Sequence, residues 1–168
     1  MKTKEVHPFG PIYDENAKVL ILGSFPSVKS RDELFFYAHP QNRFWKVMKS
    51  ITGFAGDIGE IDEKTAMLHE TRLALWDTIA SCEIIGSSDL SISSVVVNDL
   101  SVILNTADIK AVFCNGKTSY ELYRKFLEKD IGLPAKALPS TSPANASWTL
   151  EKLIEKWKAE LSPYLLQE

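Results

Sequence analysis

The sequence has few of the features that mark secreted, membrane-spanning or metal-binding proteins. Its 168 residues include only two cysteines and three histidines, and nowhere do about 18 apolar residues follow one another. Cys82 and Cys114 lie among apolar neighbours without a CxxC spacing, which favours buried, reduced thiols over a disulfide, a zinc site or an iron–sulfur cluster. We therefore expect a cytoplasmic protein with no membrane segment, no metal cluster and no other metal site.

The sequence also lacks the short motifs that bind nucleotide or metal cofactors. His7, His39 and His69 have no paired spacing such as HExxH, and no GxGxxG or P-loop run occurs. There is no internal repeat, no low-complexity segment and no linker long enough to separate domains. A chain of 168 residues is long enough for one compact core and short for two. We expect a single domain over residues 1–168 and no cofactor.

Acidic residues slightly outnumber basic ones, which argues against indiscriminate nucleic-acid binding. The net charge is −3, but five bases face two acids between residues 29 and 49, and six bases face three acids between 110 and 136. If these two basic stretches fold onto one face, they would form a local phosphate-binding surface. Solvated helix faces scattered over the surface are the alternative.

Short apolar runs alternate with helical patterns along the chain. The first run ends at Gly23, and its brevity favours a buried strand over a helix. Strands are predicted over 18–22, 73–76, 111–114 and 136–138. Helices are predicted over 43–50, 62–70, 95–105, 119–129 and 150 to about 161. Thr118 and Glu121 have the spacing of a capping box before the fourth helix. In the last helix, apolar residues recur at three- and four-residue steps and should face the core: Leu150, Leu153, Ile154, Trp157 and Leu161.

This alternation predicts an α/β fold, because parallel strands need helical crossovers. We expect a three-layer αβα sandwich with a short, mostly parallel central sheet of about four strands. In such sheets ligands bind beyond the carboxyl ends of the strands. That rule selects four loops: 23–27, the segment around 77–78, 115–117 and 139–145.

The run from 37 to 45 lies just ahead of the first predicted helix. It reads Tyr37-Ala38-His39-Pro40-Gln41-Asn42-Arg43-Phe44-Trp45. A stackable ring, an imidazole, an amide and a guanidinium could each meet a flat, polar ligand such as a nucleobase, and the proline stiffens the loop that presents them. This run should lie over the same crevice as the four loops.

Four segments resemble, in order, the motifs of the uracil-DNA glycosylase superfamily. They are Gly23-Ser24-Phe25-Pro26-Ser27, the run 37–45, Phe113-Cys114-Asn115-Gly116-Lys117, and Leu138-Pro139-Ser140-Thr141-Ser142-Pro143-Ala144-Asn145. The resemblance spans roughly residues 18 to 160. The sequence is most similar to the branch of hypoxanthine-DNA (deoxyinosine) glycosylases and next to the mismatch-specific uracil/thymine enzymes. The resemblance implies cofactor-independent hydrolysis of the N-glycosidic bond of a base flipped out of DNA.

One position departs from the uracil-processing branches. There the first loop carries an Asn or Asp that positions the attacking water, whereas the matching residue here is Phe25, whose ring can neither orient nor deprotonate water. The resemblance then assigns the catalytic amide to Asn42, which could orient the water or hydrogen-bond the departing purine. A loop or N-cap amide at the start of the following helix is the structural alternative for Asn42.

The resemblance assigns roles to further residues of the motifs. Tyr37 would stack on the extruded base, His39 would donate to the leaving base or bond the loop backbone, and Asn115 would read a base edge or simply form an Asn-Gly turn. Ser24 and Phe25 would also line the base site. No lysine matches a Schiff-base nucleophile, which favours a monofunctional hydrolase that leaves an abasic site.

The last motif is predicted to contact DNA. Ser140, Thr141 and Ser142 could donate hydrogen bonds to phosphates, together with Asn145. Pro143 and Ala144 fall where the family has a wedge that enters the vacated base stack, although alanine is smaller than the usual leucine. Lys117 would touch a phosphate or lie free on the surface.

We therefore expect a monomeric DNA repair glycosylase whose partner is DNA containing deaminated bases, above all hypoxanthine. A mismatch-type uracil/thymine glycosylase is the second hypothesis. A lesion-binding module without catalysis is the third, and a generic α/β small-molecule binder is the fourth.

Overall fold

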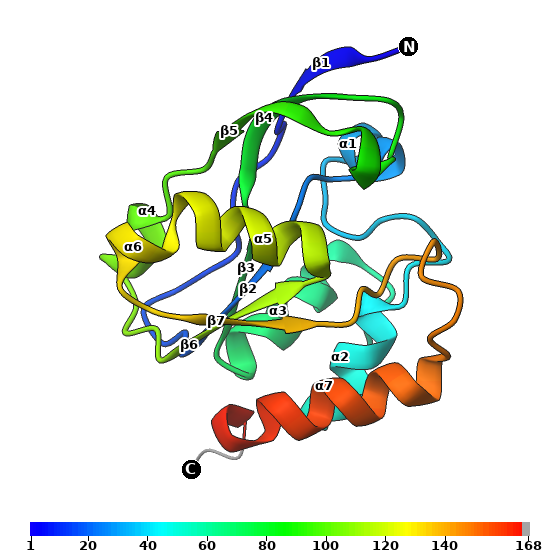
Figure 1. The fold of residues 1–168 in the computed structure, drawn as a ribbon. Helices are drawn as coiled ribbons and strands as arrows, with labels where there is room; N and C mark the ends of the chain where they lie inside the picture. The colour runs from blue at the N-terminus through cyan, green and yellow to red at the C-terminus, as the bar shows by residue number, and fades with distance from the viewer. Residues whose placement is uncertain (166–168) are drawn as a thin grey trace.

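A parallel four-stranded sheet forms the centre of the computed structural model, which describes residues 1–165 (Figure 1). Its order is β3 (Leu73–Asp77), β2 (Val19–Gly23), β6 (Ala111–Asn115) and β7 (Ala135–Leu138). Every neighbouring pair runs parallel. The four predicted strands, their parallel arrangement and the predicted α/β class are thereby confirmed.

Helices cover both faces of this sheet because successive side chains of a strand point to opposite sides. On β2, Val19 and Ile21 pack toward α2 (Phe44–Thr52), α3 (Ile61–Glu70) and α7 (Leu150–Leu165). Leu20 and Leu22 instead join the cluster of α4 (Ser101–Leu104) and α5 (Lys117–Phe126). This is the expected three-layer arrangement, with α2 and α7 below the sheet and α5 above it in Figure 1.

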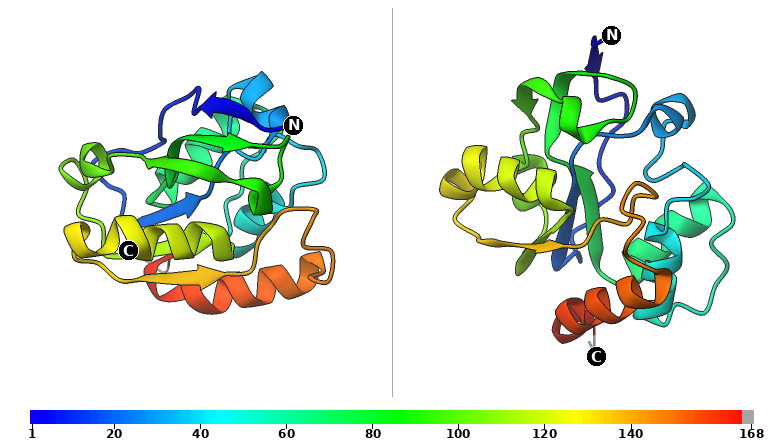
Figure 2. Two further views of the ribbon diagram at one scale, coloured as in Figure 1. Left: turned by 45° about the horizontal axis from the view of Figure 1, so that its top comes forward. Right: turned by 45° about the vertical axis from the view of Figure 1, so that its right-hand side comes forward.

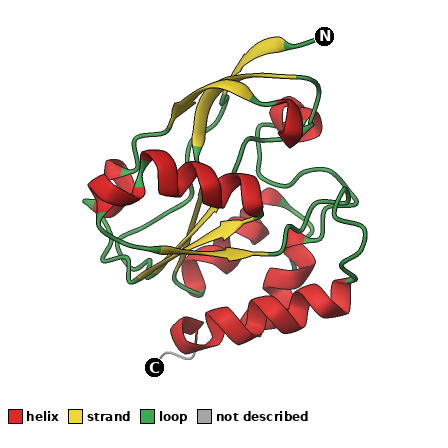
Figure 3. Ribbon diagram, viewed as in Figure 1, coloured by secondary structure: helices red, strands yellow, loops and turns green. Residues whose placement is uncertain are grey.

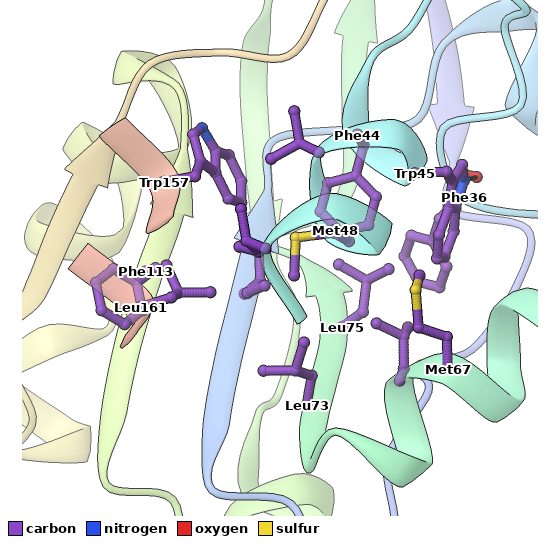
Figure 4. Close-up of a cluster of buried hydrophobic side chains, with 14 of the residues drawn as sticks. Phe36, Phe44, Trp45, Met48, Met67, Leu73, Leu75, Phe113, Trp157 and Leu161 are labelled. Carbon is purple, nitrogen blue, oxygen red and sulfur yellow. Dashed lines mark hydrogen bonds between the residues drawn. The ribbon is translucent and has the colours of Figure 1, made fainter. Parts of the chain in front are cut away.

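The larger core lies between the sheet and α2, α3 and α7 (Figure 4). Phe44 and Met48 of α2 face Trp157 of α7, and the Phe44 and Trp157 rings meet edge-on at 5.9 Å. Leu153, Trp157 and Leu161 are fully buried, as their spacing predicts. Burying large apolar side chains on both strands and helices fixes the loops at the strand ends.

A second sheet was not predicted from the sequence. It has three antiparallel strands, β1 (Thr3–Val6), β4 (Ile79–Ile84) and β5 (Ser93–Val97), in the order β1-β4-β5, and lies at the top of Figure 3. A 3-10 turn, η1 (Asp89–Ser91), joins β4 to β5. The short helix α1 (Val28–Glu33) was missed too.

The predicted helix over 95–105 is wrong. Its first part is β5 and only Ser101–Leu104 is helical. Three consecutive valines, which restrict χ1 in a helix and suit a pleated strand, explain the difference. The predicted helix 119–129 is also divided, into α5 and α6 (Glu128–Ile131).

The predicted capping box of Thr118 and Glu121 is wrong as well. Helix α5 begins at Lys117, its N-cap is Gly116, and no side chain caps it. Gly116 has φ of 99°, a left-handed conformation that glycine adopts without steric cost. The strand therefore turns into the helix through Gly116, and Thr118 lies inside the first turn.

Both cysteines are free and buried, as expected. Burial raises the pKa of the Cys114 thiol to about 12, with the Ser119 hydrogen bond opposing this. Burial also raises the pKa of Cys82. Both side chains therefore remain protonated thiols at neutral pH.

Candidate active site

A crevice of about 990 Å³ opens at the carboxyl ends of the parallel strands. The loop after β7 and the loop before α2 approach each other there, on the right of Figure 1 and in both views of Figure 2. The crevice is lined by all of the residues predicted for the site: Ser24, Phe25, Tyr37, His39, Asn42, Asn115, Lys117, Ser140, Thr141, Ser142, Pro143, Ala144 and Asn145. Segments far apart in the sequence therefore meet at one crevice, as expected for loops at the carboxyl ends of parallel strands.

Asn42 is held by its carbonyl oxygen. Asn42 Oδ1 accepts hydrogen bonds from Phe44 N at 2.9 Å and from Thr141 Oγ1 at 2.9 Å. A backbone N–H needs an acceptor, so the contact with Phe44 N identifies this end of the Asn42 amide as the oxygen and the other end as the nitrogen. Within residues 1–165, Asn42 Nδ2 makes no protein hydrogen bond, so its two N–H groups are available to the crevice.

Thr141 connects Asn42 to Asn115. Asn115 Nδ2 donates to Thr141 Oγ1 at 3.0 Å, and Asn115 Oδ1 accepts from Thr141 N at 3.1 Å. Thr141 is fully buried. The three residues come from three different motifs, and their hydrogen bonds tie the loops after β6 and β7 to the start of α2.

His39 stands half-buried at the edge of the crevice. Its Nδ1 accepts a hydrogen bond from Gln41 N at 3.1 Å. A neutral imidazole that accepts at Nδ1 carries its proton on Nε2. His39 therefore bonds the loop backbone and at the same time keeps a donor on the opposite side of the ring.

Arg43 has a structural role that the sequence did not reveal. Its guanidinium donates to the backbone carbonyls of Thr141, Ser142, Asn145 and Trp148, and its own N–H donates to Thr141 O at 3.1 Å. The planar fork suits several carbonyls at once. Arg43 thus fixes the loop 141–148 instead of facing a ligand as its place in the run suggested.

The crevice contains a buried carboxylate that the sequence analysis did not single out. Asp77 ends β3, and its Oδ2 lies 2.7 Å from His7 Nε2, with both side chains almost fully buried. Asn98 Nδ2 donates to Asp77 O at 2.8 Å and holds the end of the strand. His7 follows β1 in a segment with two prolines and no periodicity, so no sequence signal paired it with Asp77. Asp77 itself was selected only as part of a loop at a strand end.

Tyr37 lines the crevice, and its hydroxyl is buried beside Gly23. Its ring stacks on Phe44 with centroids 4.2 Å apart, so one face of the ring is covered. Tyr37 Oη has no acceptor for its proton among the described residues. Burial, followed by the charge of Asp77, raises the pKa of Tyr37 far above its ordinary value.

A second carboxylate lines the crevice from η1. Ser24 Oγ donates to Asp89 Oδ2 at 2.9 Å. Burial raises the pKa of Asp89, the Ser24 hydrogen bond lowers it, and Asp77 raises it slightly. Ser24 and Asp89 thereby join the loop after β2 to the antiparallel sheet.

Known proteins resemble this chain in sequence and in fold. A family model described as "Uracil DNA glycosylase superfamily" matches residues 11–165. The chain belongs to this superfamily. Two similar proteins are both named hypoxanthine DNA glycosylase. The one from Methanosarcina barkeri is 35% identical over 82% of this chain and 86% of its own length, and the one from Methanosarcina acetivorans is 32% identical over 90% and 94%.

The fold also matches that of a solved structure. A solution NMR structure of a candidate uracil DNA glycosylase from Methanosarcina acetivorans superposes with a TM-score of 0.79 at 29% identity, covering 93% of this chain and 96% of that chain. His7 precedes the segment that the family model matches. A residue from outside that segment therefore supports Asp77, which lines the crevice.

Phe25 occupies the wall of the crevice beside Arg31, whose guanidinium lies 5.4 Å from the ring centroid. The His7 ring meets Phe25 edge-on at 6.0 Å. An apolar ring in this surrounding offers no acceptor to a water molecule. The position therefore contributes shape to the glycosylase crevice and no acid–base group.

The two basic stretches differ in whether their charges gather at the crevice. In the first, Arg31 and Arg43 donate to backbone carbonyls and Lys29 pairs with Glu33. In the second, Lys117 is 84% exposed, lies 3.9 Å from Glu121, and lines both the crevice and a depression on α5 that Arg124 and Lys125 also line. A phosphate-binding surface is therefore better supported along α5 than along α1 and α2.

Among residues 1–165 no group of three or more His, Cys, Asp or Glu side chains is arranged to hold a metal ion. Over the same residues, no helix has the length and apolar character needed to span a bilayer.

Proposed function

We propose that this protein is a DNA glycosylase that extrudes a deaminated base, above all hypoxanthine, and hydrolyses its N-glycosidic bond to leave an abasic site. The observation that carries the proposal is the fixed amide of Asn42, with Oδ1 bound by Phe44 and Thr141 and Nδ2 free at the crevice. Two similar proteins named hypoxanthine DNA glycosylase support the choice of base.

In this reaction a water oxygen forms a bond to C1′ of the sugar while the bond from C1′ to the base nitrogen breaks. The electron pair of the broken bond leaves with the base, which gathers negative charge as the sugar gains oxocarbenium character. The water gives up a proton, and the base takes one up. Stabilising the departing base is therefore the main requirement.

Asn42 meets this requirement as a hydrogen-bond donor. Both lone-pair directions of Oδ1 are used inside the protein, so a water molecule would have to displace one of these contacts to be oriented by that oxygen. Nδ2 can donate to the departing purine or to the oxygen of the attacking water. The hydrogen bond from Thr141 withdraws charge from the amide and strengthens Nδ2 as a donor.

His39 is the second proposed catalytic residue. Its Nδ1 is occupied by Gln41 N, so the neutral ring offers the Nε2 proton. A hydrogen bond from Nε2 to the leaving base would stabilise the negative charge that develops on it. Ser24, Phe25, Tyr37 and Asn115 are proposed to surround the base.

The DNA strand is proposed to run along the loop 140–145 and the start of α5. The loop is held rigid from within by Arg43, which leaves its outward groups free to meet phosphates. Lys117 lines the crevice at the start of α5, and Pro143 and Ala144 line it from the loop proposed to enter the vacated stack.

One assay tests the proposal. Duplexes carrying deoxyinosine, deoxyuridine or no lesion are incubated with the protein, and abasic sites are then cleaved with alkali. Alkali-dependent cleavage of the deoxyinosine strand, faster than that of the deoxyuridine strand, is the expected result. Lesion-selective binding without cleavage would replace the enzyme by a binding module, and faster uracil release would establish a uracil glycosylase.

We further propose that the chain acts as one domain, as a monomer and in the cytoplasm. Light scattering of the purified protein should give the mass of a single chain, and its complex with DNA should give the mass of one chain and one duplex. A stable dimer would overturn the monomer proposal without affecting the reaction.

A further inference from the structure

A buried donor and a buried acceptor face the same point on the floor of the crevice. A Cβ atom added to Gly23 would lie 2.3 Å from Asp77 Oδ1 and 2.8 Å from Tyr37 Oη. Both atoms therefore crowd around the end of β2, and only glycine fits between them. Within residues 1–165, Asp77 Oδ1 has no donor and the Tyr37 hydroxyl proton has no acceptor.

The positions of both groups are fixed by contacts behind them. Asp77 Oδ2 is bonded to His7 Nε2 at 2.7 Å, and Asn98 holds the backbone of Asp77. Tyr37 has φ of 50°, which is unusual for a residue with a side chain, and its ring stacks on Phe44. A strained backbone that buries a hydroxyl proton without an acceptor indicates a ligand-binding role, because burying such a donor without a partner is unfavourable.

The chemical roles of the two groups are distinct. The raised pKa keeps the Tyr37 hydroxyl protonated, so that it is a hydrogen-bond donor. The Asp77 carboxylate oxygen is an acceptor. Asn115 acts on the Tyr37 oxygen as a hydrogen-bond donor, which lowers the pKa of Tyr37 and opposes the effect of burial. This contact leaves the hydroxyl proton of Tyr37 without an acceptor among residues 1–165.

This donor–acceptor pair matches the change that deamination makes to a base. In adenine, C6 carries an amino donor and N1 is an acceptor. In hypoxanthine, C6 carries a carbonyl acceptor and N1 carries a hydrogen. Conversion of cytosine to uracil makes the same exchange at C4 and N3. A fixed donor beside a fixed acceptor therefore pairs with hypoxanthine or uracil and opposes the parent base, adenine or cytosine, at both positions.

We propose that Tyr37 and Asp77 determine base specificity by reading the deaminated edge, with Tyr37 Oη donating to the carbonyl oxygen and Asp77 Oδ1 accepting from the ring N–H. This inference rests on the proposed function, since it requires that a base enters the crevice. It reassigns Tyr37 from stacking with its ring to recognition with its hydroxyl. It also gives His7 a positioning role, because His7 holds the Asp77 carboxylate.

The test measures binding, so that it does not depend on catalysis. The probes are duplexes with 2′-fluoro-deoxyinosine or 2′-fluoro-deoxyadenosine, in which the glycosidic bond resists hydrolysis. Each probe base is placed opposite a tetrahydrofuran site, so that neither base is paired. The cost of opening a base pair then does not affect the ratio of the two dissociation constants. Wild type should bind the hypoxanthine probe at least about 10-fold more tightly than the adenine probe.

Tyr37→Phe and Asp77→Asn should each reduce this preference to about 3-fold or less. Neither substitution should change affinity for a duplex that has a tetrahydrofuran site and no base at the lesion position. Tyr13→Phe, which removes a hydroxyl from a partly buried ring outside the crevice, is the matched control and should keep the full preference.

The outcomes separate the inference from the function on which it rests. An unchanged preference in both Tyr37→Phe and Asp77→Asn would overturn the inference even if the wild type excises hypoxanthine. Equal affinity of the wild type for the two bases would also overturn it. The wild type could also prefer the hypoxanthine probe and release no hypoxanthine. That result would overturn the proposed catalysis but not the proposed base recognition by Tyr37 and Asp77.

Discussion

Two sheets meet at the crevice, and they supply different kinds of residue to it. The parallel sheet positions the loops that carry Asn42, Asn115 and Thr141, whose side chains form one hydrogen-bonded group. The antiparallel sheet supplies His7 and Asp89, which bond Asp77 and Ser24 at the ends of the parallel strands. The first set lies around the proposed reaction centre, and the second supports the floor against which a base would rest. Catalysis and base recognition are therefore separable by mutation.

The largest expected effect is on the side of the parallel sheet. Asn42→Ala should lower the single-turnover rate of hypoxanthine release about 100- to 1,000-fold, because it removes a fixed donor to the departing base. Gln41→Ala, which removes an exposed amide next to it, is the control and should release hypoxanthine at the wild-type rate. Undiminished activity of Asn42→Ala would exclude that residue from the mechanism.

Gly23→Ala tests whether the positions of Asp77 and Tyr37 beside the end of β2 matter for base recognition. The added methyl group would overlap Asp77 Oδ1 and press on Tyr37 Oη, so both must shift. We expect hypoxanthine release to fall about 10- to 100-fold and the preference over adenine to be lost. Gly10→Ala is the matched control, because a Cβ there meets nothing within 4 Å. Wild-type preference in Gly23→Ala would show that the floor does not read the base.

Arg43→Lys tests the rigidity of the loop 141–148. A lysine keeps the charge, but its single ammonium cannot bond the carbonyls that the guanidinium holds. The free energy of unfolding should fall by about 2 kcal/mol, measured by urea denaturation, and affinity for abasic DNA should fall about 10-fold. Lys46→Ala, on an exposed position of α2, should change neither quantity. A stable variant with full affinity would mean that the loop keeps its shape without Arg43.

The smallest effect is expected at Asp89. Its raised pKa means that the folded protein holds the Asp89 proton more tightly than the unfolded chain does. The resulting stabilisation is present below the ordinary aspartate pKa of 3.8 and is lost as pH rises through the folded-state value. Asp89→Asn should therefore have a slightly higher Tm than wild type at about pH 8, and the difference should vanish toward about pH 4. A lower Tm of the variant at both pH values would contradict this account.

The same comparison explains what the sequence could predict. The four parallel strands are short, apolar runs, and residues such as Asn115 follow them directly, so the strand-end rule placed the motif residues at one crevice. The two outer antiparallel strands, β1 and β5, are exposed at several positions, and their sequences lack a clear alternation of apolar and polar residues. The valines of β5 were consequently assigned to a helix, and His7 had no apparent partner. Arg43 was missed as a support because its bonds reach backbone carbonyls about a hundred residues further along the chain.

Direct detection of the released base tests the central claim. Wild-type protein is incubated with a deoxyinosine duplex, and free hypoxanthine is quantified by mass spectrometry alongside alkali-labile sites in the same sample. The proposed hydrolysis predicts one free hypoxanthine for each abasic site, with the phosphodiester backbone intact before alkali. Strand cleavage without free base, or an intact deoxyinosine strand after prolonged incubation with excess protein, would contradict it.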